Sequence, residues 1–166
     1  MLAFLVLLVF EALFNRFTRS HCEGSVATAA ISNATLLEAE ETLLKYERLM
    51  AAFEFHSVMN LLDEYIRAIN KTLSDNMKLL QERNDVPAIL QVLADAAHMI
   101  KPAMLMLHPI VPAGAELVRE YLQIDERVWS WKYAFKPLSF FYPSKPHKFK
   151  FLEPRVDFFK KHESQF

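Results

Sequence analysis

Glycine is scarce in this 166-residue chain, which contains only Gly24 and Gly114. At the usual frequency of about 7%, roughly twelve glycines would be expected. A dinucleotide-binding fingerprint or a P-loop needs several closely spaced glycines, so neither motif is present. A strand-rich fold would also need many tight turns, for which few turn residues are available. The scarcity therefore predicts an all-α protein without a glycine-loop nucleotide site.

Cysteine is equally scarce, since Cys22 is the only one. One cysteine cannot form an internal disulfide, which argues against a secreted, disulfide-dependent fold. His21 is its neighbour in the sequence, but adjacent side chains on a helix point in different directions and no second cysteine is available. We therefore expect no metal site at this pair.

The chain also lacks a long hydrophobic run. The ten residues Met1–Phe10 are all apolar, but a membrane-spanning helix needs about twenty. This stretch has no basic start and no small-x-small cleavage site, both of which a signal peptide would need. It predicts instead a buried first helix from Leu2 to about Ser20, in a cytoplasmic protein that does not enter a membrane.

Four further helices follow from apolar residues at helical spacing. Thr35 and Glu38 form a capping-box pattern before the second helix, and the polar run Gln81–Asp85 ends the third. Pro87 suits the first turn of the fourth helix, and Pro112 opens the fifth. Pro102 is expected to kink or interrupt the fourth helix, because proline removes an intrahelical hydrogen bond. Together these patterns predict one domain with a bundle of about five helices over residues 1–123.

The composition changes in the last part of the chain. Residues 132–166 contain eight basic and three acidic side chains, and eleven of the 21 aromatic residues lie between Trp131 and Phe166. Four prolines in this part exclude one long helix. We expect residues 124–166 to form an extended segment packed on the bundle. Cations and aromatic rings suit phosphates and unpaired bases, but the same aromatic residues can simply cover the bundle while the lysines reach water.

Residues that could carry catalysis do not form a recognisable set. The carboxylate pairs Glu40-Glu41 and Asp63-Glu64 lie in amphipathic helices, where exposed polar faces explain them. The one approach to a di-metal Glu-x-x-His motif is Asp95-x-x-His98, which stands alone. The sequence contains no Gly-x-Ser-x-Gly elbow. We therefore predict no catalytic residue, no metal and no cofactor in this chain.

Four segments resemble the anticodon-binding domain of class I aminoacyl-tRNA synthetases. The run from Val92 to Leu122, with its His-Pro-Ile-Val-Pro turn, resembles the class as a whole. The segment Phe55–Lys71, which ends in Asn-Lys, is similar to the methionyl branch. Leu13-Phe14-Asn15-Arg16 resembles the Asn-Arg element of that branch, and Phe151–Asp157 resembles its closing Phe-Pro-Arg-Ile-Glu segment. Together these segments extend over roughly residues 10–160.

The resemblance implies an all-α domain that binds the anticodon stem-loop of a tRNA. Such a domain reads splayed bases by stacking and by hydrogen bonds to their edges. The tRNA-binding candidates that it implies are Arg16 for a base edge or phosphate, Asn15 for amide hydrogen bonds, and Asn70 and Lys71 near the end of the matching helix. The implied partners are tRNA and the catalytic domain of a methionine–tRNA ligase, with no role for DNA.

The chain departs from the methionyl pattern at several places. The tryptophan of the family is missing near Leu79, and its asparagine corresponds to Ala12. The sequence contains no His-x-Gly-His and no Lys-Met-Ser-Lys-Ser-like loop. ATP and methionine would therefore bind a catalytic domain that is not in this chain, and the chain alone is expected to be inactive. Two alternatives stay open: the same domain of a leucyl, isoleucyl or valyl enzyme, and a stand-alone helical module that binds a protein.

Overall fold

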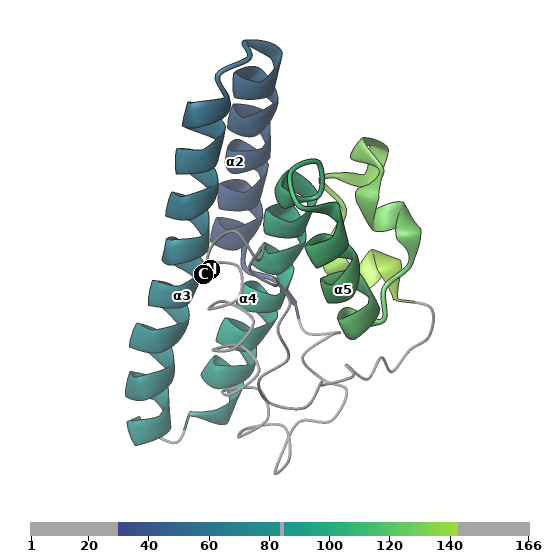
Figure 1. The fold of residues 1–166 in the computed structure, drawn as a ribbon. Coiled ribbons are helices and arrows are strands. Elements are labelled where there is room, and N and C mark those ends of the chain that lie inside the picture. Colours follow the sequence, from purple (N-terminus) through teal and green to yellow (C-terminus); the bar gives the residue numbers. More distant parts are fainter. Residues whose placement is uncertain (1–29, 84, 143–166) are drawn as a thin grey trace, which may run out of the picture.

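The computed structural model describes residues 30–83 and 85–142, and this part of the chain is all-α, with no strand. It contains four α-helices and three short 3₁₀ helices (Figure 1). They are α2 (Asn33–Ala51), α3 (Phe55–Arg83), α4 (Val86–Leu107), α5 (Pro112–Leu122), η2 (Glu126–Trp129), η3 (Trp131–Tyr133) and η4 (Leu138–Phe141). The helix expected from Leu2 to Ser20 lies outside the described residues.

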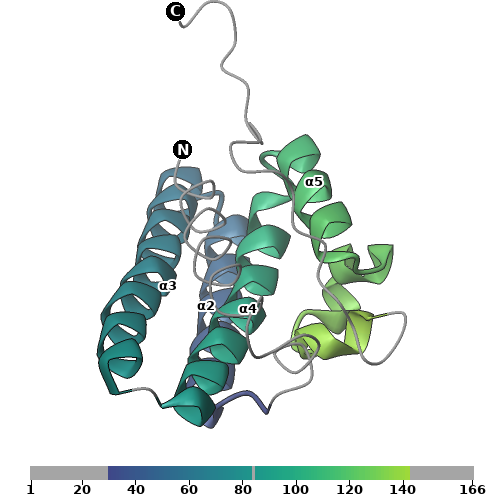
Figure 2. The same cartoon turned by 90° about the horizontal axis from the view of Figure 1, so that it is seen from below.

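Helix α4 is the centre of the arrangement. It packs against α2 and α3 on one side and against α5 on the other, as Figures 1 and 2 show. The elements η2 and η4 also contact α4. The core between these helices contains side chains with no exposed surface, among them Ile69, Leu73, Ile89, Leu93 and Met106. The sequence of α3 places apolar residues at helical spacing on one stripe, in which Phe55 and Met59 are exposed and the others are buried: Val58, Leu62, Tyr65, Ile66, Ile69 and Leu73.

Helix α2 begins one turn earlier than the capping pattern predicts. Ser32 is the N-cap, and its hydroxyl accepts a hydrogen bond from the Thr35 backbone N–H at 3.3 Å. Thr35 is therefore inside the first turn, where its hydroxyl accepts from Ser32 at 2.9 Å. The backbone N–H of Ser32 donates to Asp95 Oδ1 at 2.8 Å. This long-range bond attaches the start of α2 to α4.

Helix α4 continues through Pro102, so the expected interruption is not present. Proline removes only the one hydrogen bond that its own N–H would make, and the residues on both sides of Pro102 are buried in the bundle, where tertiary packing stabilises the helix.

Helix α4 is also the one helix among the described residues that is long and apolar enough to cross a membrane. Most of α4 is buried inside the structure, and core helices of soluble proteins can be equally long and apolar.

The start of α4 offers a test of the helix boundary. Asp85 Oδ1 accepts a hydrogen bond from the Ala88 N–H at 3.1 Å and so caps the helix, with Pro87 in the first turn. We expect Asp85→Ala to lower the free energy of unfolding by about 1 kcal/mol, because one terminal N–H loses its acceptor. Urea unfolding followed by circular dichroism measures this change. Asp85→Asn keeps an acceptor, so its free energy of unfolding should remain within a few tenths of a kcal/mol of the wild-type value. An equal loss of stability in both variants would contradict the role of Asp85 as the N-cap of α4.

The first part of the C-terminal segment is not extended as expected. Residues 124–142 form the three 3₁₀ helices, and residues 143–166 lie outside the described part of the chain. Val128, Ala134, Leu138 and Phe141 are buried and belong to the same core as α4. The segment begins after Gln123, whose left-handed conformation (φ 53°) ends α5. The apolar side of this segment therefore completes the core.

Candidate nucleic-acid interface

Two of the four predicted site residues can be placed. Asn70 and Lys71 are neighbours in α3, but their environments differ. Asn70 is half-buried, and its Oδ1 is buried without a hydrogen-bond partner, whereas Lys71 is exposed. Asn15 and Arg16 lie outside the described residues.

A second group of polar and aromatic side chains covers the outer side of residues 126–142. Trp131, Phe135 and Phe140 are 37%, 52% and 39% exposed. Two exposed cations, Lys132 and Lys136, lie between them in the sequence, and a third, Arg127, precedes Trp131. We call the six residues Arg127, Trp131, Lys132, Phe135, Lys136 and Phe140 the aromatic–basic surface.

Cations and rings already contact each other on this surface. The Arg127 guanidinium lies 5.2 Å from the centre of the Phe140 ring, and Lys132 Nζ lies 5.5 Å from that of Tyr133. The Tyr133 and Phe140 rings pack 5.4 Å apart. Arg127 also pairs with Asp125, which reduces the free positive charge at this end. Lys132 and Lys136 form no ion pair among the described residues, so they are available to an anion.

The backbone below this surface is held by a buried lysine of α4. Lys101 has no exposed surface, and its Nζ donates to the carbonyl oxygens of Tyr133 at 2.9 Å, Lys136 at 2.7 Å, and Ala134. In its protonated form the amine thus uses all three of its N–H donors. It also lies 5.3 Å from the centre of the Phe141 ring. Burial lowers the pKa of Lys101 from 10.5 to about 7.

One turn earlier on α4, His98 holds the next part of the segment. This side chain is buried, and its Nδ1 accepts a hydrogen bond from the Leu138 backbone N–H at 3.4 Å. The pKa of His98 is lowered from 6.5 to about 4, mainly by burial and also by the charge of Lys101, while the charge of Asp95 opposes both. The ring is therefore neutral at neutral pH, which is the form that can accept this bond.

The pair Asp95 and His98 has structural partners. Asp95 Oδ1 accepts hydrogen bonds from the Ser32 N–H and, at 3.1 Å, from Gln91 Nε2. His98 Nδ1 accepts a hydrogen bond from the Leu138 N–H. Among the residues that the structure describes, no group of three His, Cys, Asp or Glu side chains is placed to hold a metal ion. Both side chains connect α4 to a neighbouring segment.

The other end of the segment is attached through α5 and Trp129. The indole Nε1 of Trp129 donates to Glu116 Oε1 at 2.5 Å, and its ring stacks on His108 with 4.3 Å between ring centres. Arg119 donates to the second oxygen of Glu116 at 2.7 Å and to the Ile124 carbonyl at 3.0 Å. The aromatic–basic surface therefore rests on a segment fixed at both ends.

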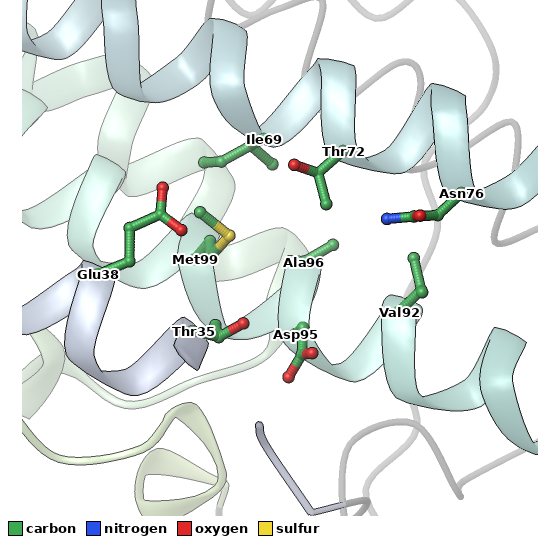
Figure 3. Close-up of a pocket in the computed structure, with 9 residues that line it drawn as sticks. All are labelled: Thr35, Glu38, Ile69, Thr72, Asn76, Val92, Asp95, Ala96 and Met99. Atoms are coloured by element: carbon green, nitrogen blue, oxygen red, sulfur yellow. The ribbon is translucent and has the colours of Figure 1, made fainter. Parts of the chain in front are cut away.

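Two cavities lie between the helices. The first, of about 90 Å³, is drawn in Figure 3, where Glu38 of α2, Thr72 and Asn76 of α3, and Asp95 of α4 surround the same space. Its size and polar lining suit a few water molecules. Tyr65 is also buried, and burial together with the charge of Glu38 raises the pKa of its phenol. The second cavity, of about 190 Å³, lies between α2, α4 and the residues that follow η3.

Sequence reasoning did not identify Lys101 as a structural residue. The available signal was a lysine inside the apolar run Met99–Leu107 of a predicted core helix, where charged side chains are rarely fully buried without partners. Its partners could not be found, because they are backbone atoms 32 to 35 residues further along the chain.

Comparisons with known proteins give no match: no protein-family model, no curated protein and no solved structure is similar to this chain.

Proposed function

We propose that the chain binds RNA, as the anticodon-binding domain of a methionine–tRNA ligase that positions tRNA for a separate catalytic domain. The observation that carries the proposal is the aromatic–basic surface, where exposed rings alternate with exposed cations. Proteins that bind single-stranded nucleic acid combine cations for phosphates with aromatic faces for bases. The resemblance of the sequence to the methionyl branch supports tRNA as the RNA.

We also propose that the whole domain is a bundle of about five helices with a C-terminal segment packed over it. In the described part, η2 and η4 contact α4, and the buried side chains Leu138 and Phe141 belong to its core. Asn15, Arg16, Asn70 and Lys71 remain the proposed contacts of the bundle with tRNA. The exposed position of Lys71 suits a phosphate contact, whereas Asn70 is half-buried and its Oδ1 has no hydrogen-bond partner among the described residues.

The test is a titration of the whole chain with tRNA at low and moderate salt, followed by fluorescence anisotropy. We expect binding that weakens as salt increases, because phosphate contacts release counterions. Arg16→Ala, and separately Phe135→Ala on the aromatic–basic surface, should each weaken binding about 5- to 100-fold, the range for loss of one good base contact or stacked base. Leu37→Ala, at an exposed α2 position outside this surface, is the matched control. Absence of any tRNA binding at low salt would overturn the proposal.

A second candidate function is binding of a protein, and it has its own observation. The turn between α2 and α3 exposes Phe53 (78%), Phe55 and Met59, with the two phenylalanine rings 6.4 Å apart in an edge-to-face arrangement. Exposed apolar groups of this kind mark protein contacts more often than RNA contacts. A Phe53→Ser, Phe55→Ser double variant that keeps full tRNA affinity would separate this surface from the RNA-binding one.

A further inference from the structure

The cavity of about 190 Å³ combines an apolar interior with two polar groups. Its lining comes from three parts of the chain: α2, α4 and the residues after η3. Leu36, Leu43, Pro102 and Ala134 provide apolar walls, and Phe135 provides an aromatic one. Glu40 and His98 are the two lining residues that can form hydrogen bonds through their side chains. The cavity is smaller than a typical small-molecule site, so it suits a single ring rather than a whole nucleotide.

The two polar groups offer one donor and one acceptor. His98 Nδ1 accepts from the Leu138 N–H, which requires the proton of the neutral ring to be on Nε2. In the described part of the chain Nε2 makes no hydrogen bond of its own, so its N–H is the donor that His98 can offer to the cavity. The exposed carboxylate of Glu40 is an acceptor with two oxygens.

The cavity is continuous with the aromatic–basic surface. Phe135 belongs to both, and Lys132 and Lys136 lie on either side of Ala134 and Phe135 in the sequence. A phosphate backbone that contacts these lysines would run beside the cavity. The side of α2 that carries Glu40 and Glu41 repels phosphates, so this arrangement favours a base, and not a phosphate, next to α2.

We propose that this cavity receives one unpaired nucleobase of the bound RNA, with Phe135 against its face and His98 and Glu40 at its edge. The proposal rests on the proposed function. Every nucleobase has a hydrogen-bond donor next to an acceptor on its edge, so the His98 N–H and the Glu40 carboxylate can bind such a pair together. A flipped or splayed base in a protein pocket is held in the same general way, by stacking and by hydrogen bonds to its edge.

Two substitutions on neighbouring residues, each of which removes one negative charge, test the proposal. Glu40→Gln removes the carboxylate at the cavity, and Glu41→Gln removes one from the next position of α2, which does not line the cavity. Both remove one negative charge near the RNA, which alone strengthens binding of a polyanion slightly. We expect Glu40→Gln instead to weaken binding about 5- to 10-fold, because a hydrogen bond to a charged acceptor is lost, and Glu41→Gln to leave it equal or slightly stronger.

The measurement is fluorescence anisotropy of the whole chain with labelled single-stranded RNA of about 12 nucleotides, within the site size of such proteins. An abasic ribose-phosphate oligomer of the same length serves as the second ligand. We expect Glu40→Gln to have no weakening effect on the abasic oligomer. If wild-type protein binds RNA but Glu40→Gln and Glu41→Gln behave alike, the base pocket is overturned and the proposed function stands. If the wild type binds no RNA, both fail.

Discussion

Lys101→Met is expected to lower the free energy of unfolding by about 3 kcal/mol or more. The substitution keeps the length of the side chain but leaves the carbonyl oxygens of Ala134 and Lys136 without a donor in the described part of the chain, while the Tyr133 carbonyl keeps only the Lys136 N–H. Each unsatisfied buried polar group costs about 1 to 3 kcal/mol. Total stabilities of proteins are about 5 to 15 kcal/mol, so this one loss is large. Urea unfolding at neutral pH measures it.

The exposed Lys71 provides the control for this prediction, since Lys71→Met removes the same charge without breaking a hydrogen bond among the described residues. It should change stability by no more than about 0.5 kcal/mol. The pH dependence gives a second check. The folded-state pKa of Lys101, about 7, is lower than its ordinary value of 10.5. The unfolded chain therefore binds more protons between these values, and stability should rise from pH 7 towards pH 9 in the wild type. A variant that keeps both the stability and this rise would contradict the role of Lys101.

Lowering the pH from 6.5 to 4 is expected to destabilise the folded protein, because His98 is buried in its neutral form. The pKa of His98 is about 4 in the folded protein and 6.5 in its ordinary state. Between these two values the unfolded chain binds more protons than the folded one, so stability falls as the pH is lowered through this window. At 1.36 kcal/mol per pKa unit the loss attributable to His98 is about 3 kcal/mol by pH 4. Urea unfolding at a series of pH values measures the slope.

His98→Gln isolates this contribution, because glutamine does not titrate and its carbonyl can still accept from the Leu138 N–H. Its stability should depend less on pH between 6.5 and 4 than that of the wild type. His56→Gln is the matched control, since it makes the same substitution at a histidine that is exposed at the start of α3. If His98→Gln unfolds with the wild-type slope, His98 is not the group responsible.

The helices themselves were predictable because they depend on local patterns. Pro87 and Pro112 in first turns and the polar run at Gln81–Asp85 place the ends of α3, α4 and α5 within a few residues. The prediction was wrong where two local signals compete: Ser32 and Thr35 are both good N-caps, and the choice of Ser32 agrees with the bond from its backbone N–H to Asp95, 63 residues away. Leu117 belongs to the apolar residues of α5 and is nevertheless 38% exposed, whereas its neighbour Val118 is buried. An amphipathic pattern shows which residues are apolar, but not how much of the apolar side a neighbouring helix covers.

The candidate interface was only partly predictable. The sequence shows the mixture of cations and aromatic residues after Gln123. It also offers two explanations for this mixture: contact with an RNA, or covering of the helical bundle. In the described part Leu138 and Phe141 complete the core, while Trp131, Phe135 and Phe140 are exposed, so the covering of the bundle accounts for only some of these side chains. Proline content suggested an extended chain, but 3₁₀ turns tolerate proline at their start, as Pro137 before η4 shows. That Glu40 and His98 line the same cavity depends on how α2 packs on α4, which no local pattern contains.

The attachment of residues 131–138 to α4 has a consequence for how this surface can evolve. Lys101 and His98 hold the segment by its backbone, through three carbonyl oxygens and one N–H. Backbone atoms are the same whatever side chains they carry. Mutations at the exposed positions 132, 135 and 136 can therefore accumulate without loosening the anchor. The fold therefore separates the support, which uses backbone atoms, from the exposed side chains, which can change without a loss of stability.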